Sequence, residues 1–252
     1  MTDLIGRAMG RLASATMLKP AIRLDQGPMC SFTFDDCPRS ALDNAGAALE
    51  SHGLSGTFFV GAGVSGEDVD PLDPLMVGDD FVRARAAGHE IGCHTFSHPH
   101  MPLLKRSEME SEFQRNWDEV RKADPDLQMT SFAYPFGEVS FSAKRAASAW
   151  FSVARGVRPG LNRRIVDLSE LRSYSLCDQT FDQAELGTLV REAARKRAWL
   201  VFTCHDVRED PSEWGCTPEQ FEFVLNEVLR SGVPVLTLKA ALGRMTHRSG
   251  IV

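Results

Sequence analysis

The sequence predicts an α/β fold in a single domain, with a parallel sheet that closes, or nearly closes, into a barrel. Short apolar segments of strand length alternate with amphipathic segments of helical length, which is the pattern of parallel strands joined by helical crossovers. About seven such units follow one another, and 252 residues is an ordinary length for a β/α barrel. No internal repeat or Gly- and Pro-rich linker divides the chain.

The first half of the chain contains four of the expected strands, each short and apolar. They cover residues 28–34, 56–60, 87–93 and 131–134. Helices are expected between them at 40–52, 80–87 and 107–123. Ser40 can cap the first helix and Gly53 can end it, because serine favours helix starts and glycine favours helix ends.

The second half continues the alternation. Strands are expected at 151–155, 172–176, 199–204 and 234–238, and helices at 142–149, 181–197 and 217–232. Thr217 opens the last helix, with Pro218 at its first position, where a missing N–H costs nothing.

The composition is that of an ordinary soluble globular protein. Hydrophobic residues make up 43% of the chain, charged residues 25%, and the formal net charge is -6. This acidic excess gives no indication of nucleic-acid binding, so no nucleic-acid partner is expected. No apolar run approaches the ~20 residues of a membrane-spanning helix.

Residues 1–27 form a basic, weakly amphipathic segment, followed by the domain proper at 28–252. The segment has neither the uninterrupted apolar core nor the cleavage site of a secretion signal, so a cytoplasmic location is expected. We interpret the segment as a surface helix that packs on the domain. The alternative is a peripheral contact with anionic lipid at the inner membrane.

Polar residues suited to catalysis follow several of the expected strands. Asp35 and Asp36 follow the first strand, and His94 and His98 follow the third. His205 follows the strand 199–204. Because the carboxyl ends of barrel strands share one face, these residues should converge there. His94 and His98, spaced i, i+4, and a carboxylate together make the three-ligand set of a catalytic zinc-like site.

The six cysteines form no CxxC pair, which argues against a cysteine zinc site. We expect them to be thiols in a reducing compartment. Cys37, Cys93 and Cys204 stand directly beside the candidate site residues. We interpret these three as small wall residues rather than nucleophiles.

Four ordered segments carry a resemblance to a known family. SFTFDDCPRS, HTFSHPH, FAYPFG and LVFTCHDV resemble, in this order, motifs of the polysaccharide deacetylases, the NodB-homology group or carbohydrate esterase family 4. The resemblance covers roughly residues 29–238 and implies a distorted (β/α)7 barrel. Without a secretion signal, the chain resembles the cytoplasmic deacetylases of exopolysaccharide pathways, such as the holdfast polysaccharide deacetylases.

The resemblance also implies roles for individual residues. Asp36, His94 and His98 would hold one divalent metal, usually zinc, which polarises the amide carbonyl and acidifies a water. Asp35 would be the general base and His205 the acid that protonates the leaving amine. The backbone N–H of Phe136 would help hold the oxyanion. Tyr134 and Trp214 are expected to contact substrate, Trp214 by stacking on a sugar ring or else packing on the rim.

Three positions depart from the family pattern. Cys37 replaces the usual glycine after the two aspartates, and Ala133 replaces the arginine that steadies the base. Among Arg172, Arg155 and Arg39, we favour Arg172 as the substitute. The fourth motif, which orients the acid histidine, is not recognisable; Asp206 and Asp178 are the candidates for that task. We expect His100 to be a rim residue, and His52, His89 and His247 to lie at the surface or at helix ends.

The expected function is metal-dependent hydrolysis of N-acetyl groups on a glycan, or on a lipid-linked precursor of an exopolysaccharide. One alternative keeps the fold but acts on a formyl group or a small cyclic amide. The other is a glycan-binding relative without turnover, which the missing arginine and fourth motif suggest. A homodimer is also expected.

Overall fold

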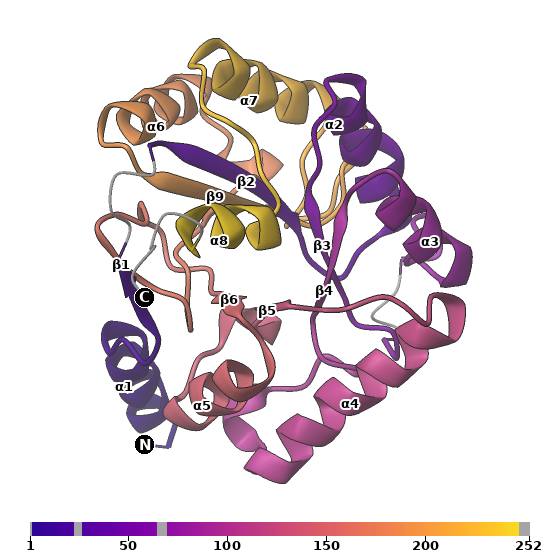
Figure 1. Ribbon diagram of the computed structural model, residues 1–252, viewed down its shortest axis with the longest axis vertical. Helices are drawn as coiled ribbons and strands as arrows, with labels where there is room; N and C mark the ends of the chain where they lie inside the picture. Colours follow the sequence, from indigo (N-terminus) through magenta and orange to yellow (C-terminus); the bar gives the residue numbers. More distant parts are fainter. Residues whose placement is uncertain (1, 23–26, 65–69, 247–252) are drawn as a thin grey trace.

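The computed structural model describes residues 2–22, 27–64 and 70–246. Its centre is a seven-stranded parallel sheet that curls around, with helices outside it (Figure 1). The strand order is β6-β5-β4-β3-β2-β9-β8. The strands are β2 (Met29–Phe34), β3 (Thr57–Val60), β4 (Glu90–Cys93), β5 (Ser131–Ala133), β6 (Val153–Arg155), β8 (Tyr174–Ser175) and β9 (Trp199–Cys204).

The segment around Leu171 brings the two edges of this sheet together. The Leu171 amide donates to the Ala154 carbonyl over 2.8 Å, and the Gly156 amide donates to the Leu171 carbonyl over 2.9 Å. A few residues later the same segment forms β8, which pairs with β9. The sheet is therefore a nearly closed barrel, as the sequence predicts, with one stretch of chain bridging its edges.

The helices cover the outside of the barrel and one of its ends (Figure 1). The outer helices are α2 (Ala47–Ser51), α3 (Gly78–Ala86), α4 (Arg106–Ala123), α5 (Phe141–Trp150), α6 (Gln183–Arg195) and α7 (Pro218–Arg230). One apolar cluster lies between the strands and these helices. A second cluster contains Phe59 and Val201 and packs against α8 (Leu238–Thr246). Both faces of the strands are thus buried, which explains their continuous apolar sequences.

One expectation about local structure was wrong, and two local features were not predicted. Residues 234–238 make only a single bridge, between Val235 and Cys30, before α8 begins. The expected helix 40–52 is present, since residues 39–51 are helical throughout, but its first part, Ala41–Gly46, is π-helical and is followed by the short α2. The sequence also gave no sign of the two-stranded antiparallel sheet of β1 (Pro20–Ile22) and β7 (Ile165–Asp167).

The N-terminal helix α1 (Thr2–Ala15) is tied to the barrel by Lys144 of α5. The Lys144 side chain is fully buried. Its ammonium donates to the carbonyls of Ala13 and Thr16 over 3.2 and 2.7 Å. It also forms ion pairs with Asp167 at 2.6 Å and Glu170 at 3.2 Å. The carbonyls at the end of α1 are therefore satisfied by a buried cation.

No helix in the described ranges is long and apolar enough to cross a membrane.

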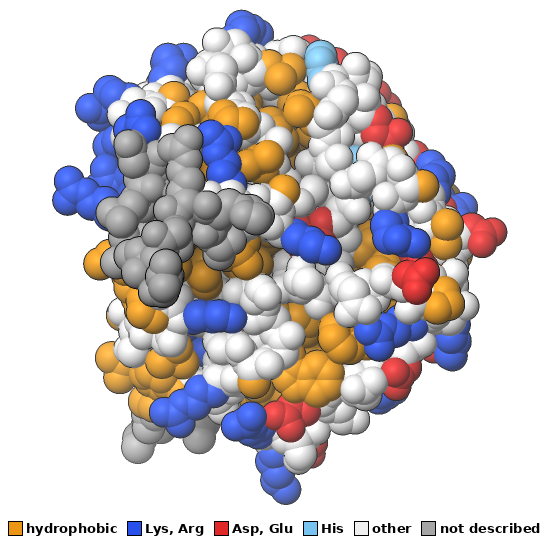
Figure 2. Space-filling view, in the orientation of Figure 1, with side chains coloured by type: hydrophobic (Ala, Val, Ile, Leu, Met, Phe, Trp, Pro, Cys, Tyr) orange, Lys and Arg blue, Asp and Glu red, His pale blue; other side chains and the backbone are white. Residues whose placement is uncertain are grey.

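Figure 2 shows Lys and Arg side chains gathered at the upper left, over α6, while the Asp and Glu side chains visible in that view lie toward its centre and right. The charge on this face is therefore uneven, although the chain carries a net charge of -6.

Candidate active site

The ends of β2, β4 and β9 bring the predicted site residues together. Asp36 lies at the centre of the group. Its Oδ1 is 3.5 Å from Nε2 of His94 and 3.6 Å from Nε2 of His98. Its Oδ2 is 3.6 Å from Nε2 of His205. One carboxylate therefore faces two histidines with one oxygen and a third histidine with the other.

Asp36, His94 and His98 fit a divalent metal. One potential ligand atom from each lies within 4.8 Å of the others. Oδ1 of Asp36 is buried and has no hydrogen-bond partner in the described part of the chain. A buried oxygen without a partner is costly, and a cation would relieve that cost. Nδ1 of His94 lies 2.8 Å from the Ala133 carbonyl, and donating to this oxygen leaves the lone pair on Nε2, facing Asp36.

His98 is neutral over the ordinary pH range. Burial, together with the charge of His94, lowers the pKa of His98 to about 4. A metal needs the neutral imidazole, whose ring nitrogen carries a free lone pair. Protons therefore compete only weakly for His98 near neutral pH.

Asp35 is held as a buried carboxylate by Arg155. The Arg155 guanidinium, fully buried at the end of β6, forms an ion pair with Oδ1 of Asp35. The Thr203 hydroxyl donates to Oδ2 over 3.3 Å. Burial alone would raise the pKa of Asp35, but the charge of Arg155, with contributions from His94 and His205, lowers it. Asp35 is thus ionised, as a general base must be.

The preference for Arg172 was therefore wrong. Arg172 is exposed, and its guanidinium donates to the Pro159 carbonyl over 3.3 Å. Arg39 forms an ion pair with Asp80 at 2.6 Å instead. Arg155 is the last residue of β6, which lies next to β5, the strand that carries Ala133, and the register pairs these two residues directly. A cation on β6 thus contacts the base from the neighbouring strand.

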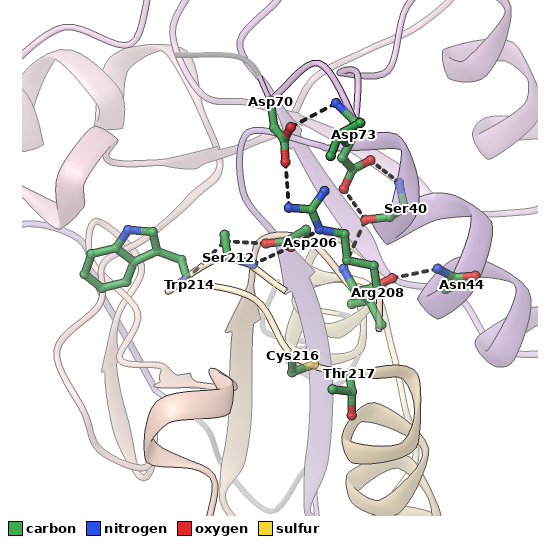
Figure 3. A network of polar contacts seen from close by, with 12 residues as sticks. Ser40, Asn44, Asp70, Asp73, Asp206, Arg208, Ser212, Trp214, Cys216 and Thr217 are labelled. Carbon is green, nitrogen blue, oxygen red and sulfur yellow. Dashed lines mark hydrogen bonds and ion pairs between the residues drawn. The ribbon is translucent and has the colours of Figure 1, made fainter. Parts of the chain in front are cut away.

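His205 has no acidic partner from the two candidates that the sequence suggested. Asp206 accepts hydrogen bonds from the Ser212 amide and hydroxyl, and its carboxylate faces Arg208 at 3.1 Å (Figure 3). Asp178 accepts a hydrogen bond from Gln220 over 2.7 Å. The amide of His205 donates to the Trp214 carbonyl over 3.2 Å. Main-chain contacts with the 206–216 loop thus hold the segment that carries His205.

A hollow opens beside this group. Asp36, His205 and Trp214 contribute to its wall, together with Asp70, Asp206 and Arg208. The Trp214 side chain is 55% exposed, and its indole lies 6.3 Å from the His205 ring, measured between ring centroids. Trp214 therefore lies at the mouth of the site, and its stacking on a sugar ring stays a prediction.

The turn Pro135–Gly137 places the Phe136 ring 4.3 Å from the His98 ring, measured between centroids. The hydrogen bonds that close this turn are donated by Gly137 and Glu138, to the carbonyls of Tyr134 and Pro135. The expectation that Tyr134 contacts substrate was wrong. The Tyr134 side chain is 1% exposed, and its hydroxyl donates to the Ser169 carbonyl over 2.7 Å, so Tyr134 anchors the turn from beneath.

Five residues at the site adopt the left-handed backbone region although none is glycine. They are Asp36, Cys37, Thr95, His98 and Phe136, with φ between 52° and 66°. Such conformations cost free energy and are concentrated at functional sites. The φ of 54° at Cys37 explains why the family pattern has glycine there, because glycine adopts this conformation without strain and cysteine does not. The Cys37 thiol donates to the Phe59 carbonyl over 3.0 Å, which helps to hold the turn.

Two polar residues on the buried face of α4, which were not predicted from the sequence, support the site: one holds the turn between His94 and His98, and the other holds the end of β3. Glu112 accepts hydrogen bonds from the amides of Phe96 and Ser97 over 3.0 and 2.7 Å. Asn116 donates to the Val60 carbonyl and accepts from the Ala62 amide, both over 2.8 Å. Their i, i+4 spacing on an otherwise apolar helix face was the available signal.

The remaining histidine and cysteine expectations are mostly confirmed. The His100 side chain is 54% exposed and lies at the rim, and His52 is exposed. His89 is the exception, because its side chain is buried. Its ring accepts a hydrogen bond from the Gly56 amide over 3.0 Å, which satisfies one buried ring nitrogen. His247 lies outside the described residues. Cys37, Cys93 and Cys204 are buried, and all six cysteines, which fall within the described part, are free thiols.

Comparisons of the sequence with known proteins identify its family. The family profile described as polysaccharide deacetylase matches residues 24–150. A chitin deacetylase of Colletotrichum lindemuthianum is 26% identical over 42% of this chain and 41% of its own length. A chitooligosaccharide deacetylase of Sinorhizobium fredii is 30% identical over 59% of this chain and 70% of its own length. The chain belongs to the polysaccharide deacetylase family.

The fold is that of the family 4 carbohydrate esterases. A family 4 acetyl xylan esterase from Clostridium thermocellum, solved in complex with a cobalt ion, superposes with a TM-score of 0.60 at 17% identity. The match covers 89% of this chain and 93% of the esterase. At this identity the structural likeness defines the fold, a distorted (β/α)7 barrel. The chemistry of the chain depends on its own residues.

Proposed function

We propose that this protein is a metal-dependent hydrolase that removes N-acetyl groups from a glycan, releasing acetate and a free amine. One observation carries the proposal. A buried carboxylate oxygen of Asp36, without a hydrogen-bond partner among the described residues, faces the imidazoles of His94 and His98, directly beside the ionised, buried Asp35. The curated relatives named as deacetylases of chitin and chitooligosaccharide support the same reaction class.

The residues of the chain divide the proton work between them. A divalent ion on Asp36, His94 and His98 would polarise the amide carbonyl and lower the pKa of a water. Asp35 takes the proton from the attacking water, since Arg155 keeps its carboxylate ionised. His205, on the other side of Asp36, gives a proton to the leaving nitrogen. The backbone N–H of Phe136 donates to the oxygen that gains charge.

Several finer features belong to the same proposal. The metal is zinc, which two imidazoles and one carboxylate with open positions suit well. The substrate is a glycan precursor inside the cell, where free thiols persist. The protein contacts lipid peripherally through its N-terminal segment and forms a homodimer. Flotation with anionic vesicles and light scattering after size exclusion test the last two features.

The test is acetate release from N-acetylglucosamine oligomers and lipid-linked glycans, by protein loaded with zinc, cobalt or manganese. Asp35→Asn should abolish release while metal binding, followed by calorimetry, persists. Asp43→Asn, which alters an exposed carboxylate, is the matched control and should behave like the parent protein. Formate release from N-formyl substrates without acetate release would favour the deformylase alternative. Tight binding of metal and glycan without turnover would favour the non-catalytic alternative.

A further inference from the structure

The backbone of Val207, two residues after His205, is held by side chains from another loop of the barrel. The Val207 amide donates to the Ser40 hydroxyl over 3.2 Å. The Asn44 side-chain amide donates to the Val207 carbonyl over 2.7 Å. Ser40 and Asn44 follow β2, on the same stretch of chain as Asp36. These two hydrogen bonds, here called the Val207 clamp, therefore join the segment that carries His205 to the loop that carries Asp36.

The Ser40 side chain is fixed in its orientation by Asp73. The buried Asp73 carboxylate accepts hydrogen bonds from the Ser40 amide over 2.9 Å and from the Ser40 hydroxyl over 2.5 Å. Because the hydroxyl proton points to Asp73, the lone pairs of the Ser40 oxygen are left for the Val207 amide. Figure 3 shows Ser40 and Asn44 both facing the segment that follows β9. One half of the clamp is thus an oriented acceptor.

The clamp completes the hold on the segment after β9. Val207 is fully buried, so its amide and carbonyl need partners inside the protein. On the other side of the segment, the His205 amide donates to the Trp214 carbonyl over 3.2 Å, and the Cys216 amide donates to the Asp206 carbonyl over 3.1 Å. The segment is therefore gripped by its own loop on one side and by the clamp on the other.

We propose that Ser40 and Asn44 are positioning residues for His205, which they hold in place through the backbone of Val207. This rests on the proposed function and adds to it the groups that fix the general acid relative to Asp36. Nε2 of His205 lies 3.6 Å from Oδ2 of Asp36. A shift of about 1 Å at a reacting group can cost about 10²-fold in rate. The clamp keeps this spacing constant because it starts from the loop that carries Asp36.

The test compares two substrates that differ in whether the leaving group needs a proton. N-acetylglucosamine oligomers release an amine, which must be protonated as it leaves. para-Nitrophenyl acetate releases a phenolate, which leaves without a proton. Ser40→Ala and Asn44→Ala should each lower kcat for the oligomers by about 10- to 100-fold, with KM little changed. Hydrolysis of the ester should stay close to the parent rate, because Asp35 and the metal-binding residues are intact.

Asp43→Ala is the matched control for Asn44→Ala. Asp43 lies in the same π-helical turn, is exposed, and forms an ion pair with Arg83 at 2.6 Å. Asn44 is exposed as well, so neither substitution opens a cavity in the core. The control should leave the rates on both substrates unchanged. Ser40→Thr keeps a hydroxyl and should retain more of kcat for the oligomers than Ser40→Ala.

Coupling to His205 separates positioning from a general effect on the fold. In a His205→Ala background, Asn44→Ala should cause no further loss on the oligomers, because the group that it positions is absent. A further loss in that background would overturn the proposal. Equal losses on the amide and the ester, or an Asp43→Ala protein as impaired as Asn44→Ala, would overturn it too.

A failure of the proposed function is distinguishable from a failure of this inference. If no substrate releases acetate, the hydrolase proposal is wrong, and NMR of the metal-free protein decides the clamp. Faster hydrogen exchange at the Val207 amide and greater mobility of the His205 ring in Ser40→Ala, but not in Asp43→Ala, would support it. Unchanged exchange and mobility in Ser40→Ala would contradict it.

Discussion

Replacement of Arg155 by methionine is the perturbation with the largest expected effect. The Arg155 side chain is fully buried and that of Asp35 is 5% exposed, so the pair is shielded from solvent. Removing one partner of a buried ion pair costs about 3–5 kcal/mol, because an uncompensated charge remains. Loss of an ionised base should lower kcat/KM by about 10²- to 10⁴-fold.

The loss of stability in Arg155→Met should depend on pH. In the parent protein the pKa of Asp35 is lowered, so its contribution to stability is present above the unfolded-state value of about 3.9 and is lost as the pH falls through the folded-state pKa. In Arg155→Met, burial raises the pKa of Asp35, so an ionised Asp35 destabilises the fold at neutral pH. The stability difference between the two proteins should therefore shrink as the pH falls toward 4.

Urea unfolding of metal-free protein at several pH values measures this difference, and the acid limb of kcat/KM should move to higher pH in the variant. Arg172→Met is the matched control, because it removes an exposed guanidinium and should change stability by less than about 0.5 kcal/mol. The reasoning is refuted if Arg155→Met keeps the acid limb of the parent, or if Arg172→Met is the variant that loses activity.

Three further outcomes are expected. Lys144→Met should lower the free energy of unfolding by about 3–5 kcal/mol, measured in urea, because it leaves Asp167 and Glu170 buried without their cation; a loss below 1 kcal/mol would contradict the role given to Lys144. Gly215→Ala should reduce the melting temperature, since the added Cβ would lie 2.2 Å from Oδ1 of Asp206, whereas Gly243→Ala, with open space, should not. The His98 ring should titrate near pH 4 in NMR spectra of metal-free protein, and stability should fall as the pH drops below about 6.5, where the unfolded state takes up the proton first.

The sequence predicted the fold best where a pattern is compatible with a single structure, as a continuous apolar segment is with a strand buried on both faces. Continuous apolar strands such as Trp199–Cys204 are buried on both faces, and they were placed correctly along with the residues that follow them. The convergence of Asp36, His94 and His98 follows from the rule that parallel strands end on one face. Residues 234–238 have the same apolar character, but a bridge to Cys30 and the start of α8 take the place of a strand.

Contacts between distant segments were not predictable. The sequence alone does not distinguish between Arg155, Arg172 and Arg39 as the partner of Asp35. Only the pairing of β5 with β6 in the fold places Arg155 against Asp35. Tyr134 belongs to the motif that carries Phe136, yet the turn directs its hydroxyl into the protein. Backbone strain at Asp36 and His98 is likewise invisible in composition, because the surrounding packing imposes it.

The most direct test of the central claim is X-ray absorption at the zinc edge of zinc-loaded protein. The account predicts two imidazole nitrogens at about 2.0–2.1 Å and a carboxylate oxygen at about 2.0–2.2 Å, with no sulfur. In Asp36→Ala protein the oxygen contribution should change and zinc affinity should fall. A sulfur ligand at about 2.3 Å, or a spectrum without imidazole scattering, would contradict a metal held by Asp36, His94 and His98.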